Sequence, residues 1–297
     1  MFELSKPVFY IVDVFAEEKY SGNQLAVFRF VEELHEKEMQ QIAREMNFSE
    51  TAFILSEEKR AGGYDVRIFT PQTEVPFAGH PTLGTAHIIQ KEIVKETINE
   101  IILNLKIGQI PVIFDTDECS DISWMRQLDP VFGDTYDAEL ISEILSLNAN
   151  EIDDRFPIQT VSTGLPTIIV PLKTLKSVKR ANVVNSKYLD FTANIDAKTL
   201  LIFCSETYNK QNELNVRFFA GRYGIPEDSA TGSGNGCLAG YLVKQEYFEK
   251  ACINLRVEQG YECGRPSLLL LKAEKKGKAI VVDVGGKVKT IAKGTLV

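Results

Sequence analysis

The sequence has few of the residues from which metal sites and disulfide frameworks are built. Its 297 residues include five cysteines and three histidines, and no two cysteines form a Cys-x-x-Cys pair. Such pairs are typical of zinc knuckles and redox motifs, and an odd, scattered set of cysteines does not indicate a disulfide framework. The chain also begins without a basic segment followed by an apolar run, the pattern of a secretory leader. We therefore expect a cytoplasmic protein without a metal ion.

Positive charge and long apolar runs are scarce as well. Lysine and arginine together number 33 against 41 acidic residues, which gives a formal net charge of −8. Binding to nucleic acid requires a basic face, so we expect no nucleic-acid partner. No stretch approaches the roughly 18 uncharged apolar residues that a membrane span needs, so we expect no membrane association.

What the sequence does contain is the ordinary composition of a globular protein, with 44 % hydrophobic and 25 % charged residues. A chain of this length buries a sizeable core without covalent staples. Runs rich in Val, Ile and Phe dominate it and predict strands. These runs span residues 10–15, 25–30, 51–55, 64–69, 98–105, 110–114, 167–172, 200–204, 215–219, 253–257, 268–272 and 279–284.

Helices are fewer, and they are of two kinds. Segments 36–46 and 138–147 place apolar residues on one face, which predicts amphipathic helices. Segments 81–90 and 235–247 each follow a glycine and are small and apolar on most sides. A helix with that pattern is usually enclosed by protein.

The two enclosed helices belong to an internal repeat. An arginine, a proline and a glycine recur in the same order in each half: Arg67, Pro76 and Gly79, then Arg217, Pro226 and Gly232. The offset is 150 residues at the arginines and prolines and 153 at the glycines, which indicates a three-residue insertion in the second copy. The alternative is chance similarity between two strand–loop–helix units. We interpret the repeat as a duplicated domain.

The duplication predicts an α+β fold of two pseudo-symmetric domains. Each would be a barrel-like, mostly antiparallel sheet around a central buried helix. We place the first domain at residues 1–117, with a final strand at about 285–297 returning to it, and the second at 118–284. A site is expected in the cleft between them.

The first chemical motif is the segment Asn-Phe-Ser-Glu-Thr at residues 47–51. It places Glu50 between an amphipathic helix and an apolar strand. A carboxylate at the mouth of such a strand is partly desolvated, which suits it to proton transfer. The alternative is that Ser49 and Glu50 form an ordinary turn.

The second motif is the segment Phe-Ala-Gly-His-Pro-Thr at residues 77–82. Pro81 suits a first helical position because it has no N–H to leave unpaired. Gly79 permits close approach of the backbone, and the free amides of the helix start form an anion site. His80 is either a structural histidine or part of that site, and its position favours the site.

The third motif is a glycine-rich segment at residues 227–236. Its glycines follow an acidic loop containing Asp228, whereas a dinucleotide fingerprint opens directly from a buried strand. No P-loop lysine follows, so we expect no nucleotide cofactor. The segment predicts a second helix that starts near Asn235, directly after a glycine turn containing Gly232 and Ser233. This helix start would face the first across the cleft and hold a small anionic metabolite such as a carboxylate.

Taken together, these motifs resemble the phenazine-biosynthesis (PhzF-like) isomerase family, which is related to diaminopimelate epimerase. The resemblance covers nearly the whole chain and depends on the order and spacing of several stretches. They read DVFAEEKYSGNQLAVF, IAREMNFSETAF, VRIFTPQTEVPFAGHPTLGTA, VRFFAGRYGIPEDSATGSGNG and EQGYECGRPSLL.

The resemblance implies roles for individual residues. The Glu50 carboxylate would move a proton, while His80 and Asp228 would assist it or position the substrate. The remaining implied residues bind polar groups of the substrate or support the site: Gly79, Gly232, Ser233, Asn23 and Ser49. The resemblance further implies catalysis without a cofactor and suggests a homodimer.

The sequence departs from these relatives at several points. The epimerases carry a cysteine at each helix start, and the corresponding residues here are Ala78 and Thr231. A two-thiol racemase mechanism is therefore disfavoured, and Cys237 is interpreted as a core residue. Gln24 replaces the proline that usually follows Gly-Asn in the phenazine enzymes. These changes leave the identity of the substrate open.

The sequence thus predicts an isomerase that moves a proton within a small carboxylate-bearing substrate by glutamate acid–base catalysis. Two alternatives stay open. One is an epimerase or racemase of an amino-acid-like compound. The other is a non-catalytic small-molecule binding protein on the same scaffold. The combination of Glu50, His80 and Asp228 favours an enzyme.

Overall fold

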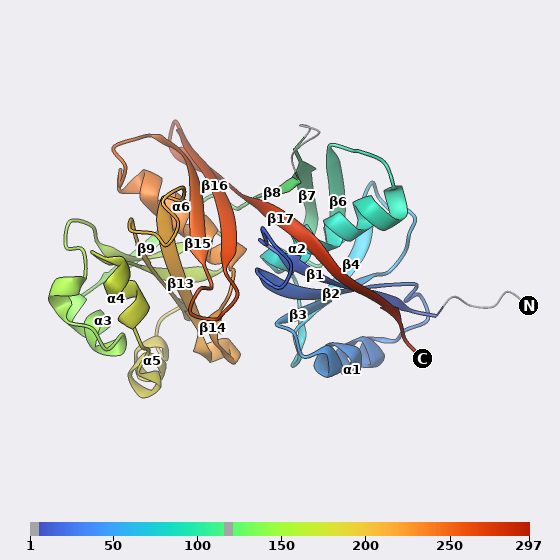
Figure 1. Cartoon of the computed structure of the whole chain (residues 1–297), viewed down its shortest axis with the longest axis horizontal. Helices are drawn as coiled ribbons and strands as arrows, with labels where there is room; N and C mark the ends of the chain where they lie inside the picture. Colours follow the sequence, from blue (N-terminus) through green and yellow to red (C-terminus); the bar gives the residue numbers. More distant parts are fainter. Residues whose placement is uncertain (1–5, 116–120) are drawn as a thin grey trace, which may run out of the picture. The chain divides into compact units, whose positions relative to one another are not determined.

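The computed structural model describes residues 6–115 and 121–297, and the chain folds into two compact units (Figure 1). Unit 1 comprises Met1–Met125 and Gly285–Val297, and unit 2 comprises Arg126–Val284. Unit 1 is therefore built from two separate pieces of the chain and unit 2 from one continuous piece.

The predicted domain boundary between residues 117 and 118 lies outside the described residues. The units change at Met125 because β8 (Ile122–Arg126) pairs with β7 (Gly108–Phe114) of unit 1. The last strand, β17 (Ala279–Thr295), begins in unit 2 and continues in unit 1, where it pairs with β1 (Val8–Val14).

Unit 1 is a closed barrel of eight strands within the described chain. The order around it is β17, β1, β2, β3, β4, β6, β7 and β8, and pairing of β8 with β17 closes the ring. The short strand β5 pairs with β4 outside this ring order. The remaining bounds are β2 (Asn23–Arg29), β3 (Glu50–Ile54), β4 (Tyr64–Phe69), β5 (Glu74–Val75) and β6 (Glu100–Leu105).

Helix α2 (Gly79–Ile88) is enclosed by this barrel. It contacts β1, β2, β3, β6 and β7, and eight of its ten residues are buried. A Cβ added at Gly84 would lie 2.6 Å from the Leu25 side chain and 3.0 Å from that of Val14, so the helix packs closely on β1 and β2. One π-helical segment, η1 (Ile89–Val94), continues it.

Helix α1 (Glu36–Met46) packs against β3 and β4. Its buried residues, Met39 and Ala43, cover an aromatic cluster that includes Phe28 and Phe53. Asn47 ends the helix in the left-handed conformation, with φ of 54°, a conformation that asparagine tolerates well. The chain then turns directly into β3, whose first residue is Glu50.

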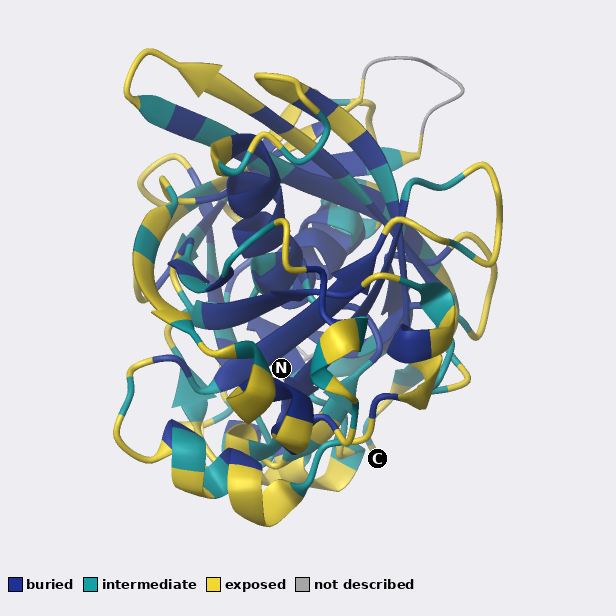
Figure 2. Cartoon of the chain, turned by 90° about the vertical axis from the view of Figure 1, so that its left-hand side faces the viewer, coloured by how far each residue is buried: buried dark blue, intermediate teal, exposed yellow. Residues whose placement is uncertain are grey.

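Unit 2 repeats this design around helix α6 (Gly232–Lys244), of which eleven residues are buried. Its strands are β9 (Val131–Tyr136), β10 (Ile158–Ser162), β11 (Pro166–Pro171), β12 (Thr199–Cys204), β13 (Leu214–Ala220), β14 (Ile225–Asp228), β15 (Cys252–Gln259) and β16 (Ser267–Lys276). Helices α3 (Ala138–Ile144), α4 (Leu175–Arg180) and α5 (Asn185–Thr192) pack with β10–β12 in a second apolar cluster. Two 3-10 turns are η2 (Ala149–Glu151) and η3 (Gly221–Tyr223). Figure 2 shows the buried strands and central helix and the exposed outer helices.

The order of strand pairings confirms the predicted pseudo-symmetry of the fold. In unit 1, the pairs β1–β2, β2–β3, β3–β4, β4–β6 and β6–β7 alternate between antiparallel and parallel, starting antiparallel. In unit 2, the pairs β10–β11, β11–β12, β12–β13, β13–β15 and β15–β16 follow the same alternation. Each unit therefore has the same topology around its buried helix.

One ion pair recurs in both copies and corrects the position of the insertion. Arg67 donates two hydrogen bonds to Glu74, at 2.8 and 2.7 Å, and Arg217 donates two to Glu227 at the same distances. The glutamate follows its arginine by 7 residues in the first copy and by 10 in the second. The three extra residues therefore lie between Arg217 and Glu227, in the turn that contains η3. The offsets in the sequence had placed them between Pro226 and Gly232.

Several short elements were absent from the sequence-based prediction. They are β5, β8, β9, β10, β14, α4 and α5. The antiparallel strands β6 and β7 form a hairpin whose turn contains Gly108, with a φ of 125°. The enclosed helices begin at Gly79 and Gly232, earlier than predicted, because burial stabilises glycine-rich turns that helix propensity disfavours.

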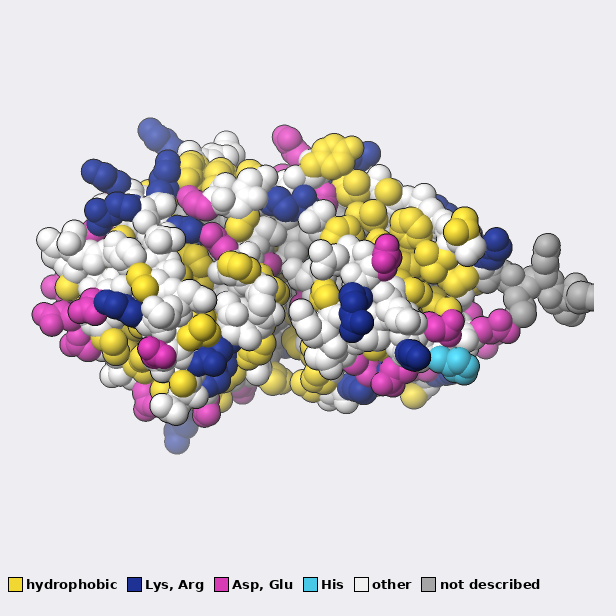
Figure 3. Space-filling view, turned by 90° about the horizontal axis from the view of Figure 1, so that it is seen from below, with side chains coloured by type: hydrophobic (Ala, Val, Ile, Leu, Met, Phe, Trp, Pro, Cys, Tyr) yellow, Lys and Arg dark blue, Asp and Glu magenta, His cyan; other side chains and the backbone are white. Residues whose placement is uncertain are grey.

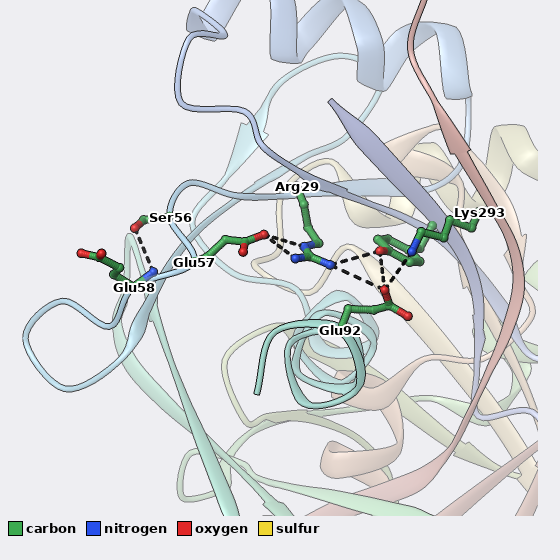
Figure 4. Close-up of polar contacts among 7 residues, drawn as sticks. Arg29, Ser56, Glu57, Glu58, Glu92 and Lys293 are labelled. Atoms are coloured by element: carbon green, nitrogen blue, oxygen red, sulfur yellow. Dashed lines mark hydrogen bonds and ion pairs between the residues drawn. The ribbon is translucent and has the colours of Figure 1, made fainter. Parts of the chain in front are cut away.

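A polar network joins β1, β2, η1 and β17 in unit 1 (Figure 4). The Arg29 side chain is 9 % exposed and forms an ion pair with Glu57. It also donates to the Tyr10 hydroxyl at 3.1 Å, and that hydroxyl donates to Glu92 at 2.7 Å. Lys293 of β17 donates to the same Glu92 carboxylate at 3.0 Å. The network thus links the returning strand to the end of the enclosed helix.

The surface shows mixed charge. On the face in Figure 3, acidic and basic side chains are interspersed. In the described part of the chain, no helix has both the length and the apolar character that crossing a membrane requires.

Candidate functional site

In unit 1, the parallel pairing of β2 and β3 places the predicted glutamate. Glu50 is the first residue of β3 and pairs with Leu25 of β2, so Asn23 and Gln24 lie at the same end of the barrel. Asn23 is 4 % exposed. Ser49 directly precedes Glu50 and is partly buried.

His80, in the first turn of α2, faces this glutamate. Its Nε2 atom lies 3.4 Å from Oε2 of Glu50, and the two side chains are 7 % and 16 % exposed. Burial lowers the pKa of His80 to about 3, against the opposing effect of a hydrogen bond to the Gln24 backbone. The imidazole is therefore neutral near pH 7.

The hydrogen bond to Gln24 fixes the tautomer of that neutral ring. A bond that raises the histidine pKa is one in which the ring donates to a backbone carbonyl. Among the described residues, Nε2 of His80 has no hydrogen-bond partner, so Nδ1 makes the bond to Gln24. In a neutral ring Nε2 is then an acceptor. Nε2 can therefore accept a hydrogen bond from a donor group on the side that faces Glu50.

The start of α2 adds a local electrostatic field. Ala78 is the N-cap residue with φ of −151° and ψ of 142°, and within the described chain no side chain caps this end. The amides of Gly79 and His80 belong to the first turn, and Pro81 has no N–H. Free first-turn amides and the helix dipole favour an anion at such an end.

In unit 2, the predicted residues gather at the start of α6. Asp228 ends β14, and Thr231 is the N-cap residue before Gly232 and Ser233. The Thr231 hydroxyl donates to Oδ2 of Asp228 at 2.5 Å, and no side chain of the described residues caps the helix. The side chain that would normally cap α6 is thus turned toward the aspartate.

One residue of this group was missed from the sequence. Gln259, at the end of β15, is fully buried and hydrogen-bonds both Asp228 and Thr231. It lies in the stretch EQGYECGRPSLL that carries the family resemblance, but no local pattern marks it. Its partners lie 28 to 31 positions earlier in the chain, so only tertiary structure brings them together.

The cysteines near these residues are not activated. Cys237 is fully buried in α6, as predicted for a core residue, and burial raises the pKa of its thiol. Burial and the nearby carboxylates of Glu227 and Asp228 raise the pKa of Cys263 to about 12. Both thiols are protonated near neutral pH and are poor nucleophiles. Among the described side chains, no three His, Cys, Asp or Glu residues form a group suited to a metal ion.

The structure therefore assembles two groups, each within its own unit. Glu50, His80, Asn23, Ser49 and Gly79 lie at one end of the unit 1 barrel. A second group, in unit 2, consists of Asp228, Gly232 and Ser233 with Thr231 and Gln259. The roles of these residues in binding and catalysis stay predictions.

Comparison with known proteins gives a consistent result along the whole chain. Residues 12–294 match the family model described as phenazine biosynthesis-like protein. The chain is 32 % identical over 287 residues to trans-2,3-dihydro-3-hydroxyanthranilate isomerase of Pseudomonas aeruginosa, covering 96 % of this chain and 97 % of the relative. It is 33 % identical to the enzyme of the same name from Pseudomonas fluorescens over 290 residues, covering 97 % and 98 %.

Solved structures agree with this result. A phenazine biosynthesis protein of the PhzF family from Bacillus anthracis is similar with a TM-score of 0.90 and 27 % identity, covering 99 % of this chain and 100 % of the other. A predicted epimerase from Pseudomonas aeruginosa follows with a TM-score of 0.77 and 30 % identity, covering 99 % of each chain. A hydroxyproline epimerase from Agrobacterium vitis shares the fold alone, at 8 % identity and a TM-score of 0.65, with 100 % of this chain and 92 % of the other covered.

Proposed function

The chain belongs to the phenazine biosynthesis-like family and is an isomerase, and from this premise we propose that it moves a proton within a small carboxylate-bearing substrate by glutamate acid–base catalysis. The observation that supports this most directly is the pairing of Glu50 with a buried, neutral histidine, with 3.4 Å between Oε2 and Nε2. No cofactor is required for such a reaction.

In the proposed mechanism Glu50 takes a proton from an activated carbon and returns it to another carbon of the same molecule. Once Glu50 is protonated, Nε2 of His80 accepts a hydrogen bond from it and orients the new O–H group. Because the pKa of His80 is lowered to about 3, the ring does not take the proton itself. The proton stays on the carboxyl group, from which it is delivered.

We propose that residues of both groups bind the substrate. The uncapped starts of α2 and α6 would hold a carboxylate. The Oδ2 atom of Asp228 accepts a hydrogen bond from the Thr231 hydroxyl. The Asp228 carboxylate would also accept a hydrogen bond from an amino or hydroxyl group of the substrate. A partner molecule of this description is a small anionic metabolite.

The proposal is tested with the purified chain and a panel of small carboxylates, with trans-2,3-dihydro-3-hydroxyanthranilate as the first member. Thermal shift identifies binders, and proton NMR in D₂O follows the position of the double bond and the hydrogen isotope at carbon. We expect the double bond to shift, with deuterium at the newly protonated carbon only to the extent that the Glu50 carboxyl group exchanges with solvent before it delivers its proton. Binding without any shift of the double bond would contradict catalysis and support the binding-protein alternative.

The same measurement separates isomerisation from epimerisation. An epimerase would exchange deuterium at one stereocentre and invert it, without moving a double bond. The structure disfavours the two-thiol form of that reaction, because Ala78 and Thr231 occupy the two helix starts. Inversion at a single carbon would overturn the isomerase proposal.

A further inference from the structure

The amide group of the buried Gln259 side chain forms hydrogen bonds with four different groups at the start of α6. Its Nε2 donates to the Asp228 carbonyl at 2.9 Å and to the Thr231 hydroxyl at 3.1 Å. Its Oε1 accepts from the Thr231 backbone amide at 3.2 Å and from Nδ2 of Asn235 at 2.8 Å. Few side chains fix so many neighbouring groups at once.

These bonds leave only one orientation for the Gln259 amide. The Thr231 backbone N–H can only donate, so the atom opposite it is Oε1. The Asp228 backbone carbonyl can only accept, so the atom opposite it is Nε2. Nε2 then also donates to the Thr231 hydroxyl. The single hydroxyl proton of Thr231 is therefore directed to the Asp228 carboxylate, 2.5 Å away.

The neighbouring asparagine shows that this arrangement has a cost. Asn235 is fully buried, and its Nδ2 donates to the Thr231 carbonyl at 3.0 Å as well as to Gln259. Its Oδ1 has no hydrogen-bond partner in the described part of the chain. A buried acceptor without a partner is destabilising, so the hydrogen bonds at the start of α6 leave one buried polar atom unsatisfied.

The first copy of the repeat shows that the barrel itself does not need this glutamine. The pairing of Asp65 with Asn104 in unit 1 corresponds to that of Asn215 with Glu258 in unit 2, and both pairs are hydrogen-bonded. The next residue along the strand is Leu105 in the first copy and Gln259 in the second. An apolar side chain thus suffices at this strand end in the same topology.

We propose that Gln259 is a positioning residue for Asp228. It orients the Thr231 hydroxyl so that its proton points to the carboxylate, and it fixes the start of α6 to the end of β14. The Asp228 carboxylate is then held in one orientation by the hydrogen bond from Thr231 to its Oδ2 atom. This inference rests on the proposed function of Asp228, but the hydrogen-bond relay can be tested without it.

The first test measures hydrogen exchange by NMR and needs no substrate. We compare the wild type with Gln259→Leu, the residue type of the first copy, and with Gln245→Leu as matched control. Gln245 lies at the other end of α6 and donates to Gln159 at 3.0 Å. We expect the Thr231 amide to exchange about tenfold faster in Gln259→Leu and unchanged in the control. Equal exchange in all three proteins would overturn the relay.

If Gln259→Leu does not fold, Thr231→Val tests the same hydrogen bonds by removing the hydroxyl group that links Gln259 to Asp228. Removing the hydroxyl takes one acceptor from Nε2 of Gln259, so we expect the side-chain amide protons of Gln259 to exchange faster. Thr231→Ser restores the hydroxyl and should restore the protection. Identical protection in Thr231→Val and the wild type would refute the inference.

The second test uses turnover on a substrate found by the screen. We expect Gln259→Leu and Thr231→Val each to lower kcat/KM about tenfold or more and the double variant to be no worse than Thr231→Val alone. In Gln259→Glu the new carboxylate cannot donate when ionised. Its activity relative to wild type should therefore fall as pH rises through the titration of the new glutamate.

The outcomes of the two tests are separable. Additive losses in the double variant, or a pH profile of Gln259→Glu parallel to that of the wild type, would reduce Gln259 to a structural residue and overturn the inference. Absence of turnover in the wild type with a confirmed exchange effect would instead count against the proposed function. In that case the relay stands as a feature of a binding site.

Discussion

At the scale of single residues, the pairing of Glu50 with His80 depends on burial more than on charge. A histidine beside a carboxylate would normally gain a proton, but desolvation lowers the pKa of this ring to about 3. The ring consequently offers an acceptor to the glutamate without competing for its proton. A lysine or arginine in this position would keep its charge and would not offer such an acceptor to Glu50.

The first prediction concerns Glu50→Gln. The amide keeps the shape of the side chain but cannot accept and return a proton, so turnover should fall about 10²- to 10⁴-fold. The midpoint of thermal unfolding should change little. The measurement is kcat on the identified substrate, with Glu45→Gln, an exposed residue of α1, as control. Activity close to that of the wild type would remove Glu50 from the mechanism.

The second prediction is that stability falls in mild acid because of His80. Its pKa is about 3 in the folded protein and near 6.5 in the unfolded chain, so the unfolded state binds the extra proton between these values. The free energy of unfolding should therefore decrease as pH falls from about 6.5 toward 3, by about 2 kcal/mol at pH 5 from this residue. Partly buried His87, whose pKa is lowered to about 4, adds an effect of the same sign.

Urea unfolding at pH 7, 6 and 5 checks this prediction. We expect His80→Asn to lose less stability than the wild type over this range. His35→Asn, which replaces an exposed histidine, should follow the wild type. The same loss in all three proteins would show that His80 is not held neutral by the fold.

At the scale of elements, the sequence predicts the strands and the two enclosed helices well but misplaces where the helices begin. Residues 232–236 read Gly-Ser-Gly-Asn-Gly, and such residues are poor helix formers. The helix starts among them because the surrounding barrel encloses it. Ala78, likewise, is an unusual N-cap residue, so no local pattern indicates that α2 starts at Gly79.

The short elements escaped prediction for a related reason. Strand β9 is mostly exposed and shows no clear alternation of polar and apolar residues. Strand β14 contains two acidic residues because Glu227 pairs with Arg217 and Asp228 faces Thr231. Tertiary contacts that a local pattern does not contain stabilise both strands.

The third prediction concerns the packing of α2. Alanine at Gly84 would place a Cβ 2.6 Å from Leu25 and 3.0 Å from Val14, both in a core without room to move. Alanine has the higher helix propensity by about 1 kcal/mol, but overpacking costs about 1–3 kcal/mol. We therefore expect Gly84→Ala to lower the free energy of unfolding by about 1 kcal/mol.

Denaturant unfolding measures this change, with Gln41→Ala on the exposed side of α1 as control for propensity. The control should stay within about 0.5 kcal/mol of the wild type. A Gly84→Ala protein that is more stable than the wild type would mean that α2 is packed less tightly than described.

At the scale of the whole molecule, sequence reasoning recovered the duplication and the topology but not the tertiary partners that position the site. The repeat of Arg67 as Arg217 is visible in the sequence because both arginines serve the same ion pair. Gln259 is not visible, because its counterpart Leu105 is apolar and its partners lie on other elements. Differences between the two copies thus carry information that the repeat itself hides.

The fourth prediction tests how the returning strand is attached. Arg29→Met removes the buried cation and leaves Glu57, Glu92 and Tyr10 without it, which should lower the free energy of unfolding by about 2–3 kcal/mol. Lys293→Met removes a cation that is 58 % exposed from the same network and should cost at most about 1 kcal/mol. Denaturant unfolding of both variants gives the comparison, and equal losses would show that the network is not organised around Arg29.

The division of unit 1 into two pieces of chain has a consequence for how the protein is made. During synthesis, residues 126–284 emerge as one continuous piece, so unit 2 has its full set of residues before unit 1 does. The barrel of unit 1 lacks β17, the partner of β1 and β8, until residues 285–297 have been translated. Although its first strands are synthesised earliest, the half that carries Glu50 and His80 closes last. A ribosome-bound chain therefore holds an open barrel edge for most of its synthesis, and the barrel around Glu50 and His80 closes only after translation has passed the second unit.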